Sequence, residues 1–274
     1  MNLNLSVESA EIQFKEILED FFITIYDERS LSSHGIDHHR RVWKYAKELL
    51  HFKFDTNSGL SFQFILKLII ACYLHDIGMS VDSGIRHGKH SSNLCKEFLS
   101  KNNLQINEYE DLLETIENHD RKEYTGDSEV NELLTILSVA DDLDAFGFSG
   151  IYRYSEIYLI RGIKPEIIGE MIIENAAKRF EYFEKNFGQN IQLLQKHRDR
   201  YSILIRFFTE YNKQAPSYRF ECQKPLGFCG VVELFIKMIK NKKVLNEIFQ
   251  EQEKYPEDHI IQWFFNGLKT EILK

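Results

Sequence analysis

Apolar residues recur every three or four positions along almost the whole chain, and runs that alternate between apolar and polar residues are scarce. This spacing places apolar side chains on one face of a helix, so the pattern predicts an all-α fold. Glycines and the few prolines fall between the periodic runs, where they end helices. The predicted helices cover about 8–27, 37–52, 61–77, 91–101, 107–120, 128–146, 150–161, 165–187, 190–212, 231–250 and 256–273.

Local signals support several of these boundaries. Asp37 and Ser61 are predicted to begin helices as N-terminal caps, and Gly78 is predicted to end the helix that starts at Ser61. Pro165 is expected in the first turn of its helix, where the missing N–H costs nothing. The segment 216–230 contains two prolines and two glycines and is expected to interrupt the helical series.

Composition and charge narrow the class of protein. The 274 residues are 43% hydrophobic and carry a net charge of −8, which excludes a disordered chain and argues against a broad nucleic-acid-binding surface. The four cysteines form no C-x-x-C pair, and the first residues show no basic and apolar secretory signal. The most apolar stretch, 62–74, is shorter than the roughly 20 residues of a membrane span. We therefore expect a cytoplasmic protein with no membrane association.

Histidine is unevenly distributed. Eight of the ten histidines lie in the first 120 residues, and histidine is the commonest metal ligand in proteins. A single histidine on an inward helix face is more often a hydrogen-bonded core residue than a ligand. Only a histidine whose inward position is shared with other ligand-type residues points to a metal.

Four predicted helices each turn such a residue toward the core. His38, His119 and Asp141 lie on the apolar stripes of their helices, and His75 and Asp76 are adjacent at the end of the most apolar helix. Burying an unpaired carboxylate is expensive, so a shared divalent cation explains the pattern. Imidazole and carboxylate ligands without thiolate suit Mn, Fe, Co, Ni, Zn or Mg.

Three short motifs, in this order, resemble the HD-domain superfamily of metal-dependent phosphohydrolases. They are His38-His39-Arg40-Arg41-Val42, the HDIG motif His75-Asp76-Ile77-Gly78, and Ala140-Asp141-Asp142-Leu143-Asp144. The resemblance implies an HD-domain helical bundle with additional C-terminal helices. Residues 1–29 would form an N-terminal helix, 30–190 the HD phosphohydrolase domain, and 191–274 a helical extension that packs on the domain or follows it.

Dinuclear members of this superfamily carry two further histidines between the His-Asp pair and the last aspartate. Here 86–92 resembles the segment that supplies the first, with His87 as the match and His90 as the alternative, and 117–121 resembles the second, with His119. No Gly-Tyr-Pro follows His119, which separates the chain from the cyclic-di-nucleotide branch. By resemblance, one or two metal ions would be bound by residues from the set His38, His75, Asp76, His87, His90, His119 and Asp141.

The resemblance also implies catalytic and substrate-binding residues. Asp76 and His87 would act with a metal-activated hydroxide, and Arg41 and Lys89 would donate hydrogen bonds to phosphate, although Arg41 could equally form a structural ion pair. The candidates for substrate binding are His34, Arg41, Arg121, Asp144 and Arg153.

The function implied by the resemblance is hydrolysis of a phosphomonoester or phosphodiester, most naturally a nucleotide or a related small phosphorylated metabolite. Two alternatives have the same ligand set: a di-iron HD-type oxygenase and a non-enzymatic metal-binding sensor or interaction module. The apolar residues of 231–274 could close the core or pair two chains, so a homo-oligomer stays open.

Overall fold

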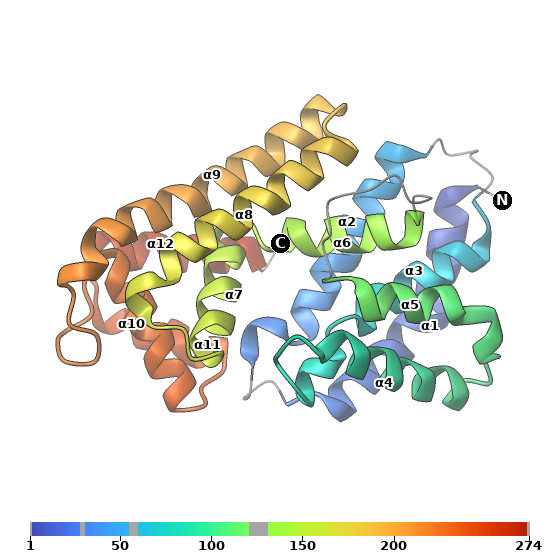
Figure 1. Ribbon diagram of the computed structural model, residues 1–274, viewed down its shortest axis with the longest axis horizontal. Helices are drawn as coiled ribbons and strands as arrows, with labels where there is room; N and C mark the ends of the chain where they lie inside the picture. Colours follow the sequence, from blue (N-terminus) through green and yellow to red (C-terminus); the bar gives the residue numbers. More distant parts are fainter. Residues whose placement is uncertain (1, 28–30, 55–59, 121–130, 273–274) are drawn as a thin grey trace. The chain divides into compact units, whose positions relative to one another are not determined.

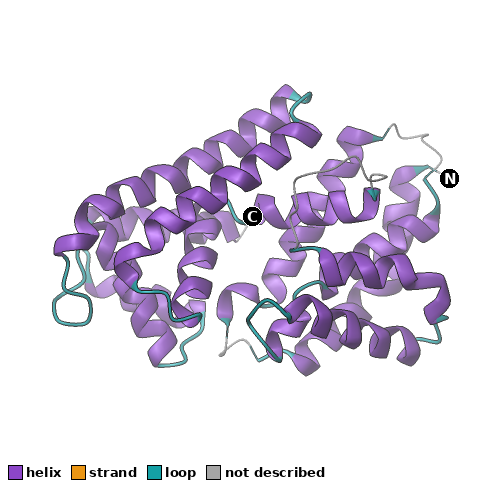
Figure 2. Ribbon diagram, in the orientation of Figure 1, coloured by secondary structure: helices purple, strands orange, loops and turns teal. Residues whose placement is uncertain are grey.

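The protein is described by a computed structural model over residues 2–27, 31–54, 60–120 and 131–272. Helices and short connecting loops make up all of these ranges, and no strand occurs within them (Figure 2). The predicted all-α fold is therefore confirmed. The periodicity of apolar residues carries this information because a helix buries one stripe of side chains against its neighbours.

The described chain forms two compact units. The first runs up to Asp27 and resumes from His34 to Leu143, and the second contains the short stretch that ends at Ser33 and the chain from Asp144 onward. The two units are defined by contacts between residues. The boundaries expected near 29 and 190 are instead based on sequence resemblance to a family. The expected division into terminal helix, HD domain and extension therefore stays a prediction.

The first unit is built around one apolar helix. Its helices, labelled in Figure 1, are α1 (Leu3–Ile25), α2 (Ile36–Lys53), α3 (Phe62–Leu74), α4 (His87–Lys101), α5 (Glu110–Asn118) and α6 (Glu132–Asp144). Helix α3 contacts α1, α2, α4 and α5, and from Leu68 to Leu74 every side chain is buried. A helix that is apolar on all sides must lie inside a bundle. The end of α3 is thereby placed in the interior.

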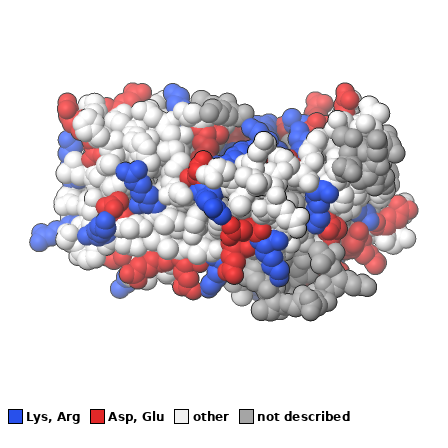
Figure 3. All heavy atoms as spheres, turned by 90° about the horizontal axis from the view of Figure 1, so that it is seen from above, with Lys and Arg blue, Asp and Glu red and all other residues white. Residues whose placement is uncertain are grey.

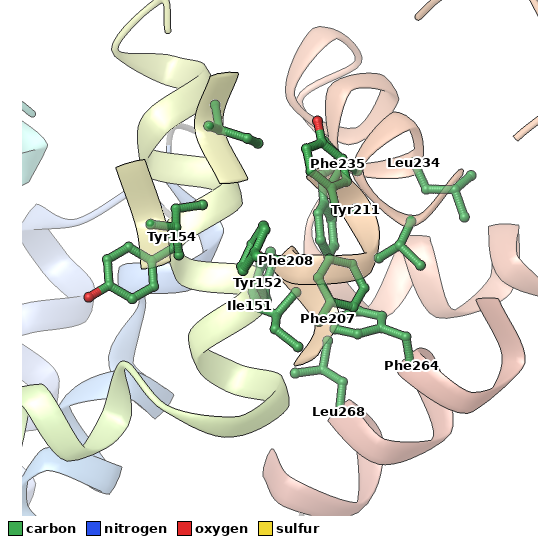
Figure 4. Close-up of a cluster of buried hydrophobic side chains, with 14 of the residues drawn as sticks. Ile151, Tyr152, Tyr154, Phe207, Phe208, Tyr211, Leu234, Phe235, Phe264 and Leu268 are labelled. Carbon is green, nitrogen blue, oxygen red and sulfur yellow. The ribbon is translucent and has the colours of Figure 1, made fainter. Parts of the chain in front are cut away.

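The second unit has an aromatic-rich core. Its helices are α7 (Gly147–Ile160), α8 (Pro165–Phe187), α9 (Ile191–Gln214), α10 (Gly227–Lys240), α11 (Leu245–Glu251) and α12 (His259–Ile272). Figure 4 shows side chains from α7, α9, α10 and α12 meeting at Phe207, Phe208 and Phe235. Phe207 packs edge to face on Phe208 with ring centroids 5.0 Å apart, a geometry that aromatic pairs favour.

Several predicted helix ends are confirmed. Ser61 caps α3 by accepting a hydrogen bond from the N–H of Phe64, and Pro165 occupies the first turn of α8. The interruption predicted at 216–230 lies between α9 and α10, and Gly147, with φ +73°, separates α6 from α7. These boundaries depend on capping, proline and glycine residues, which can be recognised in the sequence.

Other boundaries differ from the predictions. Gly35 and not Asp37 is the N-cap of α2, and Asp37 lies in its first turn. Helix α3 ends before the predicted Gly78, α4 begins earlier than the predicted 91, and residues 106–109 form a 3-10 turn before α5. The predicted helix 231–250 is divided into α10 and α11 because Lys242, at φ 50°, leaves the helical conformation. The start of the predicted helix 128–146 lies outside the described residues.

One apolar segment of the described chain resembles a membrane span in its composition. Residues Phe62–Ser80, with mean hydropathy 1.4, are long and apolar enough to cross a membrane by length and composition alone, but 78% of the segment is buried inside the protein. Burial against neighbouring helices accounts for its apolar character. The high hydropathy of this segment is therefore explained by the burial of α3 and of the residues that follow it.

Charged side chains are mixed on the surface. On the face shown in Figure 3, the lysine and arginine side chains of the described residues are interspersed with aspartate and glutamate. Mixed charge of this kind does not form a continuous basic field on that face. The absence of a broad nucleic-acid-binding surface remains a prediction for the chain as a whole.

A buried carboxylate holds together two parts of the second unit. Glu156 of α7 accepts hydrogen bonds from the backbone N–H groups of Ser32 and Ser33, at 3.1 and 2.6 Å. Ser32 in turn accepts a hydrogen bond through Oγ from the N–H of Leu245, at 3.2 Å. Burial raises the pKa of Glu156 to about 7, although the hydrogen bonds from Ser33 and Ser32 partly oppose this shift.

This raised pKa predicts a pH dependence of stability. The folded chain holds the Glu156 proton more tightly than the unfolded chain. The contribution of protonated Glu156 to the free energy of unfolding is therefore complete below about pH 4.5 and is lost as the pH rises through about 7. Glu156→Gln should remove that loss, which amounts to about 3 kcal/mol. Urea unfolding followed by circular dichroism between pH 5 and 8 measures it, with exposed Glu170→Gln as the matched control. Parallel pH profiles for wild type and Glu156→Gln would contradict the prediction.

Candidate metal centre

The ligand-type residues predicted from the first unit meet in its interior. His38 comes from α2, His75 and Asp76 from the end of α3, His87 from the start of α4, His119 from the end of α5 and Asp141 from α6. They form two groups that share Asp76, in each of which the ligand atoms lie within 4.8 Å of one another. The first group is His38, His75, Asp76 and Asp141, and the second is Asp76, His87 and His119.

The carboxylate of Asp76 faces both groups, one oxygen toward each. Its Oδ2 lies 3.4 Å from Nε2 of His75 and 3.6 Å from Nε2 of His38. Its Oδ1 lies 3.0 Å from Nε2 of His119 and 3.4 Å from Nε2 of His87. Since the side chain is only 3% exposed, water contributes little to its solvation. Asp76 therefore presents one carboxylate oxygen to each ligand group.

Backbone carbonyls set the tautomers of the histidines. The Nδ1 atoms of His75, His87 and His119 lie 3.1, 2.7 and 2.7 Å from the carbonyl oxygens of Cys72, Gly84 and Ile116. A carbonyl can only accept, so Nδ1 carries the proton and donates in each pair. The Nε2 atoms therefore face Asp76, where each can hold a second proton or a cation, and an Nδ1–H bound to a carbonyl is the arrangement found around metal-binding histidines.

Two imidazole nitrogens in the first group approach closely. Nε2 of His38 and Nε2 of His75 are 3.3 Å apart, and lone pairs at that distance in a dry interior repel unless a proton or a cation lies between them. Burial lowers the pKa of His75, but Asp76 and Asp141 outweigh this and raise the pKa to about 10. Burial likewise opposes ionisation of Asp76, and the surrounding imidazoles bring the pKa of Asp76 well below its usual range. The site therefore favours bound positive charge.

The donors fit a divalent cation. They are buried nitrogen and oxygen atoms, and Nε2 of His87 has no hydrogen-bond partner among the described residues. A buried nitrogen without a partner is costly, and a metal ion would satisfy it. The oxygen and nitrogen donor set suits Mn, Fe, Co, Ni, Zn or Mg.

Two glycines allow the helices to approach closely enough to form this site. A Cβ on Gly78 would lie 2.2 Å from the carbonyl oxygen of His87 and 2.4 Å from the N–H nitrogen of Ser91, so the first turn of α4 packs directly on it. The N–H of Gly78 donates to Oγ of Ser91 at 2.8 Å. Glycine in the His75-Asp76-Ile77-Gly78 motif is therefore required by packing.

Gly88 has the same effect between α4 and α5. A Cβ there would lie 2.5 Å from the carbonyl oxygen of Glu117 and 3.3 Å from that of Ile116. The rings of His87 and His119 are consequently only 5.2 Å apart between centroids. The small residue after His87 thus brings the two histidines of the second group together.

The remaining predicted residues are placed as follows. His34 is buried, and its Nε2 lies 4.0 Å from Oδ2 of Asp76. Arg41 is half-buried on α2 and Lys89 is exposed on α4, while His90 is half-buried and belongs to neither ligand group, so the geometry favours His87 over His90. Arg121 lies outside the described residues.

Asp144 and Arg153 lie in the second unit, where they pair with each other. Nη1 of Arg153 is 3.5 Å from Oδ2 of Asp144, and both side chains are buried. Burying such a pair costs solvation of both charges, which their attraction offsets. The predicted part of these two residues in substrate binding stays a prediction.

Sequence reasoning missed several residues that support the ligands. The carbonyl of Cys72 accepts from both His75 and His39, and Oγ of Ser138 donates to the carbonyl of His119 at 3.0 Å. A backbone carbonyl that accepts a hydrogen bond cannot be predicted from the pattern of side chains. Ser138 could have been noticed, because a serine three residues before Asp141 lies on the same face of α6.

Comparison with known proteins agrees with this geometry. The sequence pattern of the HD-domain family matches residues 35–145, which include every residue of the two ligand groups. Residues 35–145 form an HD domain. HD domains occur in a superfamily that includes metal-dependent phosphohydrolases, and the His75-Asp76 pair of this one lies at the centre of the cluster.

The fold likeness extends beyond the HD domain. A crystal structure of a Lactobacillus plantarum protein from a structural genomics programme is similar to 80% of this chain and to all of its own, with a TM-score of 0.54 and 16% sequence identity. At this identity the similarity concerns the fold alone. A comparison with curated proteins finds no significant sequence match.

The close packing at Gly88 leads to a prediction. Gly88→Ala should lower the free energy of unfolding by about 1–3 kcal/mol and weaken metal binding, because the added methyl group pushes the end of α5 away. In an open helix interior the same change would stabilise by about 1 kcal/mol. Chemical unfolding and metal analysis after dialysis measure the two effects.

Asn93→Ala, at an exposed position of the same helix, is the control and should leave both quantities near wild type. A Gly88→Ala protein that is more stable than wild type and binds metal normally would show that the close approach is unimportant.

Proposed function

We propose that this chain is a divalent-metal-dependent phosphohydrolase that cleaves a phosphomonoester or phosphodiester of a nucleotide or a related small metabolite. The observation that carries the proposal is the buried carboxylate of Asp76, one oxygen of which faces His38 and His75 while the other faces His87 and His119. Such an arrangement supports two adjacent cations, which is the arrangement that phosphoryl-transfer chemistry uses.

The protein residues have separate tasks in this proposal. A bound divalent cation supplies Lewis acidity, which neutralises phosphoryl oxygens and lowers the pKa of water. His38, His75 and Asp141 would hold one cation, His87 and His119 would hold a second, and Asp76 would contribute to both. Because backbone carbonyls fix the Nδ1–H tautomers of His75, His87 and His119, these three rings would present Nε2 to a cation without a change of tautomer.

Cationic side chains near the histidine-bearing helices would bind the phosphate. Arg41 lies three residues after His38 on α2, and Lys89 lies two after His87 on α4, so both follow ligands closely in the chain. Arg121 follows His119 by two residues in the same way. His34, 4.0 Å from Asp76, is proposed to contact substrate beside the metals. A small cytoplasmic substrate is consistent with net charge −8, which disfavours long polyanions.

The test is a metal-dependence screen. Chelator-treated protein is reloaded with Mn, Co, Ni, Mg, Zn or Fe and assayed with p-nitrophenyl phosphate, bis-p-nitrophenyl phosphate and a set of nucleotides. Turnover restored by at least one metal supports the proposal. Iron-dependent oxygen consumption without phosphate release would assign the site to oxygenase chemistry, and metal binding without any turnover would assign it to a sensor.

Asp76→Ala should reduce turnover by on the order of 1000-fold or more, because both cation positions lose their shared ligand. Bound metal should fall with it, whereas the circular dichroism spectrum should stay near that of wild type. Asp37→Ala removes an exposed carboxylate from the HD domain and serves as the matched control. An Asp76→Ala enzyme that keeps a tenth or more of the activity would exclude this mechanism.

His119→Ala should affect only the second group. It removes one of the three ligands of the second group and leaves His38, His75 and Asp141 intact. Metal content measured by mass spectrometry should fall from two equivalents to one, and turnover should fall with it. One equivalent of metal in both wild type and His119→Ala would show that the site is not dinuclear.

A further inference from the structure

The end of α3 carries a backbone acceptor that the helix itself does not satisfy. The last carbonyl groups of a helix have no intrahelical donor, and α3 ends at Leu74, two residues after Cys72. The carbonyl oxygen of Cys72 lies 3.1 Å from Nδ1 of His75 and 3.0 Å from Nδ1 of His39. One buried carbonyl therefore accepts two imidazole N–H groups, one from its own helix and one from α2.

His39 differs from the histidines that surround it. It is fully buried, and its ring packs on Phe22 with a centroid separation of 4.4 Å. The carbonyl of Cys72 can only accept a hydrogen bond, so Nδ1 of His39 carries a proton and donates it.

The position of His39 in the chain links two ligands of the first group. Its direct neighbour His38 belongs to the first ligand group, whereas its hydrogen-bond partner Cys72 lies three residues before His75. The rings of His39 and His75 are 4.9 Å apart between centroids. A movement of His39 would therefore change the distance between α2 and the end of α3 at the site itself.

We infer that His39 is a positioning residue: by donating to the Cys72 carbonyl it holds the end of α3, and with it His75 and Asp76, against the helix that carries His38. The inference rests on the proposed metal centre for its effect on metal affinity. Its structural half, the hydrogen bond from α2 to the end of α3, concerns the metal-free protein and can be tested without any metal.

A second role for the same ring must be separated from this one. His38, His39 and His75 also lie close enough to form a ligand group of three imidazoles, and Nε2 of His39 has no hydrogen-bond partner among the described residues. Direct ligation would use Nε2, whereas positioning uses Nδ1. The two nitrogens can be separated by substitution, because asparagine places its amide N–H₂ near the position of Nδ1 and offers nothing at Nε2.

The experiment compares His39→Asn with His39→Leu, in which the leucine fills similar space but donates no hydrogen bond. Thermal unfolding of the chelator-treated proteins tests the helix contact, and titration with Co²⁺, followed by its visible absorption, tests metal affinity. We expect His39→Leu to lose Co²⁺ affinity by about 10–100-fold, as is usual when a residue that orients a ligand is removed. It should also unfold at a lower temperature than wild type. His39→Asn should recover most of both losses.

Three outcomes would overturn the inference. If His39→Leu matches wild type in both measurements, the hydrogen bond does not position the ligands. If His39→Asn is as defective as His39→Leu in Co²⁺ binding but not in unfolding, His39 is itself a ligand through Nε2. If both variants are equally destabilised without metal, only the shape of the imidazole ring matters. Failure of wild type to bind Co²⁺ would instead reject the proposed metal centre, and the unfolding comparison would still decide the role of the hydrogen bond.

Discussion

A single buried carboxylate organises the HD domain. Asp76 lies almost out of contact with water, yet its environment keeps the pKa of the group well below its usual range. A charge in that position is tolerated only when positive charge or strong donors replace the lost solvation. The surrounding imidazoles replace the lost solvation. Five histidines from separate parts of the chain lie within 4.0 Å of an oxygen of Asp76: His34, His38, His75, His87 and His119.

Bringing those imidazoles together places demands on the backbone. The end of α3 must be in the interior, which explains why no charged residue occurs from Leu68 to Leu74 and why the hydropathy of Phe62–Ser80 resembles that of a membrane span. Gly78 and Gly88 remove the side chains that would keep α4 away from the end of α3 and from α5. The carbonyls of Cys72, Gly84 and Ile116 then fix which nitrogen of each ring faces inward. Close helix packing and the hydrogen bonds between histidine rings and backbone carbonyls thus both help to form the same site.

The second unit relies on a different kind of interaction. Its core consists largely of aromatic and aliphatic side chains from α7, α9, α10 and α12. Buried charges there are met by local partners: Glu156 by the N–H groups of Ser32 and Ser33, Glu233 by the N–H of Glu221, and Asp144 by Arg153. These contacts are structural, whereas Asp76 is approached by several imidazoles.

The sequence alone determined the helical class, most helix positions, and the identity of the residues that cluster around Asp76. Each of these depends on spacing within one helix or on short ordered motifs, and both can be read along the chain. Only the tertiary structure decided that His87 and not His90 faces Asp76, that α10 ends at Lys240, and that one carbonyl accepts from both His39 and His75. Those features arise from contacts between segments far apart in the chain and from backbone atoms, which every residue carries and which the sequence therefore does not distinguish.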